Sequence, residues 1–423
     1  MRRFLAVGLL ICATAAAQVA PIPMADEISG RPFAIQHTWV IGGVGDWDYL
    51  TLDSTAEQLF IAHGAVVQVV DLEAGKLAGT VTGFYDAHQI VLDRTGGYGY
   101  VTDGPANQVK VFDRGSFEVV ASIPTGPQPR SLVLEPNSGL LLAICAGTVQ
   151  DEPAQPKTAP GKQASRPRRM PGRNPQGSFS TITVIDPQAR KTLANILVAG
   201  KLGFADTDGD GNVYVLVPDA DRITRLDVMA MSNEIGRQQK LAATPKRAAP
   251  DAGQPLLLDW SGMGTTNAPP ETRPFPIGIG GGCQEPHGMA VDGHNNRLFV
   301  ACANMKMVVV DSNAGGTITS MTIGPGADSV AYDASRGLIF TANGGGFGSV
   351  TVIRQHLTDS YSVIQDLPSQ AQARTITVDS STGKVYLVAT LYGAKLGPPP
   401  ATGMGTFKMD PINGSFQVLE IGR

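Results

Sequence analysis

His88-Gln-Ile-Val-Leu-Asp93 opens the stretch that decides the fold, and three more short runs follow it: Gly97-Tyr-Gly-Tyr-Val-Thr-Asp103, Val109-Lys-Val-Phe-Asp113 and Phe117-Glu-Val-Val-Ala-Ser-Ile123. Each run is rich in β-branched or aromatic residues and is bounded by Gly, Asp, Asn or Pro. This is the pattern of consecutive antiparallel strands joined by tight turns. A unit of roughly forty residues therefore predicts one four-stranded antiparallel sheet.

The unit recurs along the chain, and acids mark the ends of its strands. The first strand of each unit ends in an acid: Asp53, Asp93, Glu135, Asp208, Asp292, Asp333 and Asp379. The third strand ends in one too, except at Arg354: Asp71, Asp113, Asp186, Asp227, Asp311 and Asp410. An acid there accepts hydrogen bonds from the backbone of the next turn, so we predict structural roles for them. Sheets stacked radially bury both faces, so the repeats predict an all-β, seven-bladed β-propeller of four-stranded antiparallel blades.

The second strands carry a further signature. They read Phe60-Ile-Ala-His63, Tyr100-Val-Thr-Asp103, Phe299-Val-Ala-Cys302 and Phe340-Thr-Ala-Asn343. These runs resemble the Tyr-Val-Thr-Asn motif of the YVTN/YncE-like propeller family, over about residues 33–423 apart from the insertions. The resemblance implies a ring closed by pairing the two chain ends within one blade. It says little about function, because propellers host unrelated activities.

The two chain ends leave the number of blades open. The segment Phe33 to Ile41 and the segment Phe416 to Ile421 each look like the outer strand of the last blade. We favour seven blades with the N-terminal segment docked on the last one. The alternative is eight blades, with a degenerate one inside the second insertion.

Composition and the N-terminus suggest an exported globular protein. The chain has 423 residues, 42% hydrophobic residues and a formal net charge of −4, which permits a large core and does not indicate a nucleic-acid-binding surface. Met1-Arg2-Arg3, an apolar run and Ala15-Ala16-Ala17 predict a signal peptide over residues 1–17, followed by a linker over 18–32. The apolar run is too short for a membrane span. We expect a periplasmic or secreted monomer without a transmembrane segment.

Few cysteines are present. Cys12 follows Ile11, which is too large for a lipoprotein cleavage site, so no lipid anchor is expected. Cys145, Cys283 and Cys302 would remain in the mature chain. Cys283 and Cys302 lie in the same repeat and form the plausible disulfide, which leaves one thiol unpaired.

Three insertions interrupt the repeats, at about residues 148–177, 232–282 and 391–406. The first carries Lys157, Lys162, Arg166, Arg168, Arg169 and Arg173. In the second, we expect the segment Asn233–Leu241 to form the outer strand of the fourth blade. All three insertions would then emerge on the face where the first strands begin. Loops on a rigid scaffold commonly carry the functional site, so we expect the site on that face.

The same face predicts a set of channel-mouth residues that bind a ligand: Trp47, Asp48, His63, His88, Asp103, Arg130, His287, Asn304, Asp328, Asn343 and Arg374. Arg130 and Arg374 suit a carboxylate or phosphate, or would pair with Asp48 or Asp328. A metal site at His63, His88 and His287 is the less favoured interpretation, and no cofactor is predicted.

Asp206-Thr-Asp-Gly-Asp-Gly-Asn212 resembles the start of a calcium loop. It has Val217 where an EF-hand needs its twelfth-position Glu, so an ordinary turn is expected.

Two functions remain open at this point. The favoured one is a non-catalytic binding or scaffold propeller that recognises a partner protein or small ligand on the face with the long loops. The alternative is a propeller enzyme, a lactonase-like hydrolase or a quinone-linked dehydrogenase component, that uses polar residues at the channel mouth.

Overall fold

The computed structural model describes residues 31–147, 179–242, 255–259, 274–396 and 407–423. One compact unit runs from Phe33 to Gly422. The predicted signal peptide, most of the linker and all of the insertion at 148–177 lie outside the described residues. The structure describes no helix whose length and hydropathy would suffice to span a bilayer.

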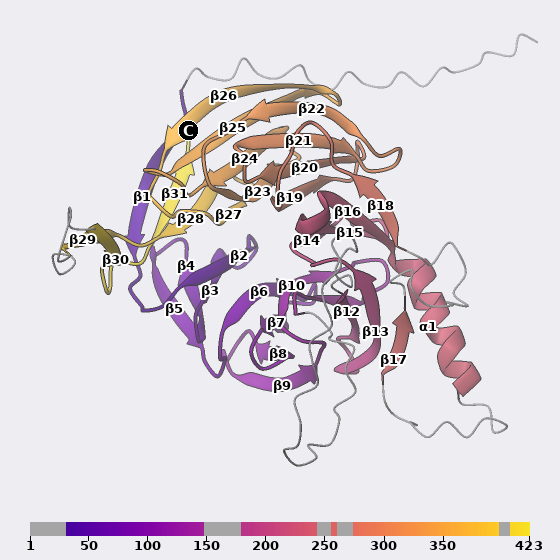
Figure 1. The fold of residues 1–423 in the computed structure, drawn as a ribbon. Coiled ribbons are helices and arrows are strands. Elements are labelled where there is room, and N and C mark those ends of the chain that lie inside the picture. Colours follow the sequence, from indigo (N-terminus) through magenta and orange to yellow (C-terminus); the bar gives the residue numbers. More distant parts are fainter. Residues whose placement is uncertain (1–30, 148–178, 243–254, 260–273, 397–406) are drawn as a thin grey trace, which may run out of the picture. The chain divides into compact units, whose positions relative to one another are not determined.

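Across these ranges the unit Phe33–Gly422 is a seven-bladed β-propeller (Figure 1). The first blade has β2 (Trp47–Asp53), β3 (Gln58–His63), β4 (Val66–Asp71) and β5 (Lys76–Val81). The second has β6 (Ala87–Leu92), β7 (Tyr98–Asp103), β8 (Gln108–Asp113) and β9 (Val119–Pro124). The third has β10 (Pro129–Leu134), β11 (Leu141–Cys145), β12 (Phe179–Asp186) and β13 (Lys191–Ala199), to which β17 (Leu256–Asp259) adds a parallel fifth strand.

The remaining blades follow the same order. The fourth has β14 (Ala205–Thr207), β15 (Asn212–Val217), β16 (Arg222–Asp227) and β18 (Phe275–Gly278), with a 3₁₀ turn at Pro218–Ala220. The fifth has β19 (Pro286–Asp292), β20 (Arg297–Cys302), β21 (Lys306–Asp311) and β22 (Thr317–Thr322). The sixth has β23 (Ala327–Asp333), β24 (Leu338–Asn343), β25 (Ser349–Leu357) and β26 (Ser360–Pro368). The seventh has β27 (Ile376–Val378), β28 (Val385–Ala389), β31 (Gln417–Gly422) and β1 (Ala34–Val40).

The seventh blade shows how the ring closes. Its outer strand is β1, from the N-terminal end, which pairs antiparallel with β31 from the C-terminal end (Figure 1). The docked N-terminal segment and the count of seven are thus confirmed, and the described sheets leave no eighth blade. The segment Phe416 to Ile421, expected as an outer strand, belongs instead to the third strand. The expected third strand ending at Asp410 is wrong, because β29 (Tyr392–Leu396) and β30 (Phe407–Pro411) form a separate hairpin within the insertion.

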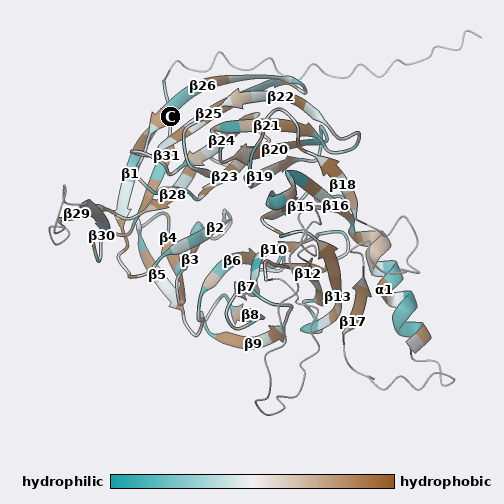
Figure 2. Ribbon diagram, viewed as in Figure 1, coloured by the Kyte–Doolittle hydropathy of each residue, from teal (hydrophilic) through white to brown (hydrophobic). Residues whose placement is uncertain are grey.

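The fourth blade also departs from expectation. The segment Asn233–Leu241 is not an outer strand but part of the helix α1 (Val228–Ala242), and β18 takes the outer position. Val228, Met231 and Ile235 are buried, and their spacing of three and four residues places them on one helical face. Figure 2 shows the brown of hydrophobic residues along the neighbouring β13 and β17, while part of α1 is hydrophilic.

This correction changes where the second insertion emerges. We call the end of the ring at which the first strands begin the entry face, and the opposite end the turn face. Connections from second to third strands lie on the entry face, as do those from one blade to the next. The chain from α1 to β18 joins a third strand to a fourth, so it leaves from the turn face. Only the insertions of the third and seventh blades share the entry face.

Most acids at the strand ends act as predicted, whereas Asp93 accepts from the hydroxyl of Thr95 instead of from a backbone N–H. Asp53 Oδ1 accepts hydrogen bonds from the backbone N–H groups of Thr55 and Ala56, at 3.0 and 3.1 Å. Asp208, in the calcium-like segment, accepts from the N–H groups of Asp210 and Asn212 in the same way. The backbone N–H groups of the turns between strands therefore donate their hydrogen bonds to these carboxylates.

The cysteines follow the sequence interpretation. Cys283 and Cys302 form a disulfide with a Cα–Cα distance of 5.4 Å. Cys145 is a free thiol buried in the third blade, and burial raises its pKa to about 12.

Candidate functional site

The inner strands share an irregularity at the entry face. Their register with the second strand shifts by one residue near the start of β2, β6, β10, β19 and β23. The residues at these bulges include Asp48, Tyr49, His88, Gln89, Arg130, His287 and Asp328. A bulge re-aims a side chain that regular alternation would point into a blade. The bulges therefore explain why consecutive polar residues, such as His88 and Gln89, lie at the mouth of the channel.

The first group of mouth residues joins the first and second blades. Nδ1 of His88 lies 2.9 Å from Oδ2 of Asp48, and its Nε2 lies 3.6 Å from Oδ2 of Asp86. His88 is buried, whereas Asp48 is partly exposed. Gly104 leaves room for the ring, since a Cβ there would lie 2.7 Å from Nε2 of His88.

The second group joins the fifth, sixth, seventh and first blades. Arg374 contacts Asp328 at 3.6 Å and Asp46 at 3.2 Å, and it donates a hydrogen bond to the backbone oxygen of Trp47 at 2.9 Å. Its guanidinium also lies 5.6 Å from the centre of the Trp47 ring. His287 lies 3.7 Å from Asp328. Arg374 therefore pairs with Asp328, one of the two partnerships that the sequence left open.

Tyr49 lies among these charges, and sequence reasoning missed it. Its ring centre is 5.3 Å from that of Phe204, which precedes β14 of the fourth blade. Burial raises the pKa of Tyr49, and the carboxylates of Asp48 and Asp328 raise it further, against the effect of Arg130 and Arg374. Because the first and fourth blades lie across the ring from each other, this aromatic contact bridges the channel.

Two predicted mouth residues serve their own blades instead. His63 is buried, with Nδ1 2.7 Å from the side-chain oxygen of Gln68. Asp103 is fully buried and accepts hydrogen bonds from the backbone N–H groups of Tyr85 and Asp86, each at 3.1 Å. Both side chains hold entry-face loops in place.

Two asparagines are used in the same way. Asn304 donates a hydrogen bond to the backbone oxygen of Gly282 at 2.7 Å. Asn343 is fully buried and donates to the hydroxyl of Thr351 at 2.9 Å. The structure thus brings together the residues that begin the first strands, whereas those at or just after the ends of the second strands bind their own blades and loops.

The three histidines of the possible metal site have separate settings. His63 binds Gln68, His88 lies beside Asp48, and His287 lies beside Asp328. In the part of the chain that the structure describes, no group of three or more His, Cys, Asp or Glu side chains is arranged to hold a metal ion.

Exposed apolar side chains surround the mouth on the entry-face loops. Phe347 is 96% exposed, Tyr85 76% and Val44 74%. Met305, Leu391 and Ile412 are also exposed, on loops that leave from the same face. The sequence carried a signal for two of them, because Val44 and Phe347 each stand between glycines. Apolar side chains presented to water mark a contact surface where several of them gather on one face.

A cavity with a mixed polar and apolar lining lies farther along the channel wall. It measures about 350 Å³ and is lined by parts of β6, β10 and β14, including Gln89, Leu132 and Asp206. Burial raises the pKa of Asp206 to about 7, although Thr207 donates a backbone hydrogen bond to it at 2.8 Å. This carboxyl group therefore changes protonation near neutral pH.

Comparison with known proteins supports the architecture. No family model and no curated protein sequence matches the chain. Among solved structures, the chain is similar to U3-55K, with a TM-score of 0.60 and 8% identity over 92% of this chain and 98% of the other. It is similar to a chain of a mitotic checkpoint complex, with a TM-score of 0.57 and 10% identity over 90% and 96%. A chain of Kuenenia stuttgartiensis hydrazine synthase has a TM-score of 0.50 and 14% identity over 73% and 84%. Identities this low show the propeller fold alone.

Proposed function

We propose that the chain is a non-catalytic binding propeller that holds a partner protein on its entry face. One observation carries the proposal: exposed apolar side chains on several blades surround a polar, charged channel mouth on that face. The predicted signal peptide supports a location outside the cytoplasm. The second-strand motifs support membership of the YVTN/YncE-like family.

The apolar side chains fit the anchoring part of a protein interface. Aromatic residues are enriched at interfaces and often supply most of the binding energy. Phe347 and Tyr85 stand on different blades, and each is largely exposed to solvent. Together with Val44, they would contact a partner at separated points around the mouth.

The charges of the mouth indicate what the centre of the partner surface carries. Asp46, Asp48, Asp86 and Asp328 outnumber Arg374 and Arg130 there. Since like charges repel, an acidic partner surface would be disfavoured at this point. We infer that a lysine or arginine side chain of the partner faces the mouth.

The test compares two exposed positions on opposite faces. A photo-crosslinking residue replaces Phe347 on the entry face, and in the matched control it replaces Leu357, which is 73% exposed between β25 and β26 on the turn face. We expect a discrete adduct in cells from position 347 and none from position 357. The captured protein is then purified, and its affinity is measured for the Tyr85→Ala/Phe347→Ala variant. Equal adducts from both positions, or unchanged affinity, would refute the proposal.

An enzyme is the second candidate, and Asp206 is the observation that favours it. A carboxyl group with a pKa near 7 beside a cavity suits general acid–base catalysis. Screening lactones and alcohols as substrates with wild type and Asp206→Asn would decide. Turnover of a substrate by the wild type that is lost in Asp206→Asn would establish catalysis in the channel.

A further inference from the structure

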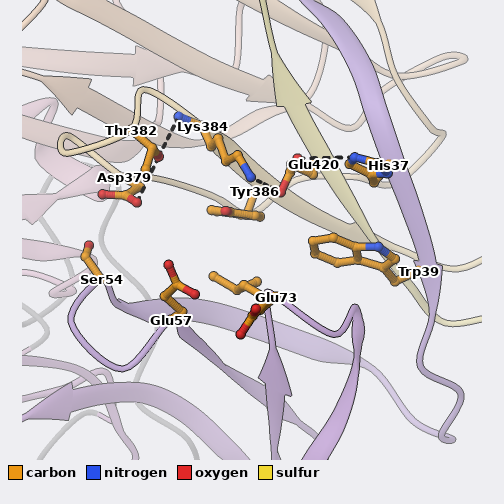
Figure 3. A pocket seen from close by; sticks show the side chains of 11 residues that line it. His37, Trp39, Ser54, Glu57, Glu73, Asp379, Thr382, Lys384, Tyr386 and Glu420 are labelled. Atoms are coloured by element: carbon orange, nitrogen blue, oxygen red, sulfur yellow. Dashed lines mark hydrogen bonds and ion pairs between the residues drawn. The ribbon is translucent and has the colours of Figure 1, made fainter.

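A second cavity lies on the turn face, at the place where the ring closes. It measures about 490 Å³ and is bounded by the seventh and first blades. Its walls come from the chain's two ends, through His37 and Trp39 of β1 and Glu420 of β31, and from turns of the first blade (Figure 3). It is therefore separate from the entry face and from the partner site proposed above.

One part of the cavity wall is aromatic. The Trp39 ring stacks on His37 with centres 6.0 Å apart, and on Tyr386 with centres 6.5 Å apart. Trp39 is only partly buried, although it belongs to a wall packed against the core. An aromatic face of this kind attracts cations, with tryptophan the strongest.

The opposite part of the wall is acidic. Glu57 and Glu73 lie on exposed turns of the first blade, and Figure 3 shows both across the cavity from Tyr386 and Lys384. Neither glutamate side chain has an ion-pair or hydrogen-bond partner among the described residues. Their charges are not neutralised by the protein itself.

The cavity retains a negative charge after its internal pairs are counted. Glu420 is buried and is matched by Lys384 at 3.1 Å, with His37 at 4.0 Å. Asp379 is used by the turn that follows β27, where it accepts hydrogen bonds from Ser381 and Thr382. Burial and the nearby Glu420 and Asp379 raise the pKa of the Tyr386 hydroxyl, as a negative environment would.

We propose that this cavity binds an organic cation that carries an ammonium group. The partly buried Trp39, stacked on His37 and on the buried Tyr386, supplies the aromatic face for its alkyl or quaternary part, and Glu57 and Glu73 supply the counter-charges. A cavity of this size suits a small molecule or a single side chain. A bare metal ion fits less well, because the described acids do not form a metal-binding group.

The position of the cavity gives binding a structural consequence. A ligand here would contact β1 and the first blade at once, so it binds only when the ring is closed. A ligand that binds only the closed form stabilises it by mass action. Binding is therefore expected to raise the melting temperature as well as to release or absorb heat.

The experiment is calorimetric titration of the mature protein with putrescine, choline and N-acetyl-lysinamide, with 1,4-butanediol as the uncharged probe and Ca²⁺ as the metal probe. We expect at least one ammonium compound to bind, its affinity to fall with added salt, and neither butanediol nor Ca²⁺ to bind. Tighter binding of N-acetyl-lysinamide would assign the ammonium to a protein side chain. Tighter binding of putrescine or choline would assign it to a free amine.

Variants locate the site. The Glu57→Gln/Glu73→Gln variant should weaken binding by about tenfold, because two partly exposed ion pairs are lost. The matched control is Glu118→Gln, which changes an exposed glutamate in the turn that joins the third and fourth strands of the second blade and should leave affinity unchanged. Trp39→Phe should weaken binding while keeping an aromatic face. Absence of binding by all three ammonium compounds, or equal affinity in the double variant, would overturn the proposal.

Discussion

Because Phe33 lies where the ring closes, its contribution to the stability of the fold can be predicted. Phe33 immediately precedes β1 and is 4% exposed, with its ring edge-on to Phe340 and centres 5.4 Å apart. Its backbone N–H donates to the side-chain oxygen of Gln365 at 2.8 Å, and its carbonyl accepts from the amide of Gln365 at 2.8 Å. Phe33 thus connects the N-terminal strand to the sixth blade as well as the seventh.

Phe33→Ala should lower the free energy of unfolding by about 3 kcal/mol, near the lower end for a buried phenylalanine, because both bonds to Gln365 can persist. With an unfolding entropy of about 2.1 cal/mol/K per residue over the roughly 390 residues of the unit, the melting temperature should fall by about 4 °C. The matched control is Phe347→Ala, a change at a 96% exposed position. It should alter the melting temperature by less than about 1 °C.

Differential scanning calorimetry and urea unfolding measure both variants. A fall in the melting temperature that is no larger for Phe33→Ala than for Phe347→Ala would show that β1 does not hold the ring closed. A separate low-temperature transition in Phe33→Ala alone would mean that the strand detaches before the blades unfold. That result would refute cooperative closure, although it would leave the pairing of β1 with β31 intact.

Three further predictions concern the interior. Reduction of the Cys283–Cys302 disulfide, with its sequence separation of 19, should lower the free energy of unfolding by about 3 kcal/mol, as urea titrations with and without dithiothreitol would measure. Cys145 should resist iodoacetamide at pH 8 in the folded protein and react after unfolding, because burial and a pKa of about 12 keep it a thiol; mass spectrometry detects the adduct. Between about pH 4 and 7, Asp206 binds more protons in the folded than in the unfolded state. The free energy of unfolding that this group contributes therefore falls as pH rises through that window, and it is constant above it. Asp206→Asn should therefore gain stability over wild type at pH 8 and none at pH 4; a difference that does not depend on pH would contradict the shift.

Most of the fold was accessible from the sequence because its determinants are local. Each turn is specified by an acid such as Asp53 or Asp311 and by the runs on either side, and every blade repeats this arrangement. The errors occurred where the repeat was interrupted. The buried residues of α1, including Met231 and Ile235, have helical spacing, although we expected an outer strand over Asn233–Leu241.

The prediction of the last blade was wrong for a different reason. Chain order suggested that the segment before Asp410 was a third strand, whereas β29 and β30 pair only with each other. Strand order within a sheet depends on contacts far apart in the sequence, such as those of Trp39 with Val418. Local sequence patterns cannot show which of two strand-like segments, here β30 or β31, occupies the third position in the sheet.

The candidate site was predicted in part, and the bulges explain the division. Asp48, His88 and Asp328 were found because they begin first strands. Tyr49 was not among the expected residues, and the register shift near the start of β2 brings it into the channel beside Asp48. A bulge adds one residue to one strand, and the residue types do not predict where it occurs.

The acidic side chains at the two ends of the ring have different partners. On the turn face, acids such as Asp53 and Asp333 accept backbone hydrogen bonds within one turn, and Asp53 also forms an ion pair with Arg114 of the second blade. On the entry face, Asp48 and Asp328 instead pair across blades and leave part of their charge exposed. Glutamates that lie beyond a turn's own acid have no backbone N–H to satisfy, so their charge remains available to a ligand. The ligand sites of a propeller are thus best sought among the acids that the turns do not use.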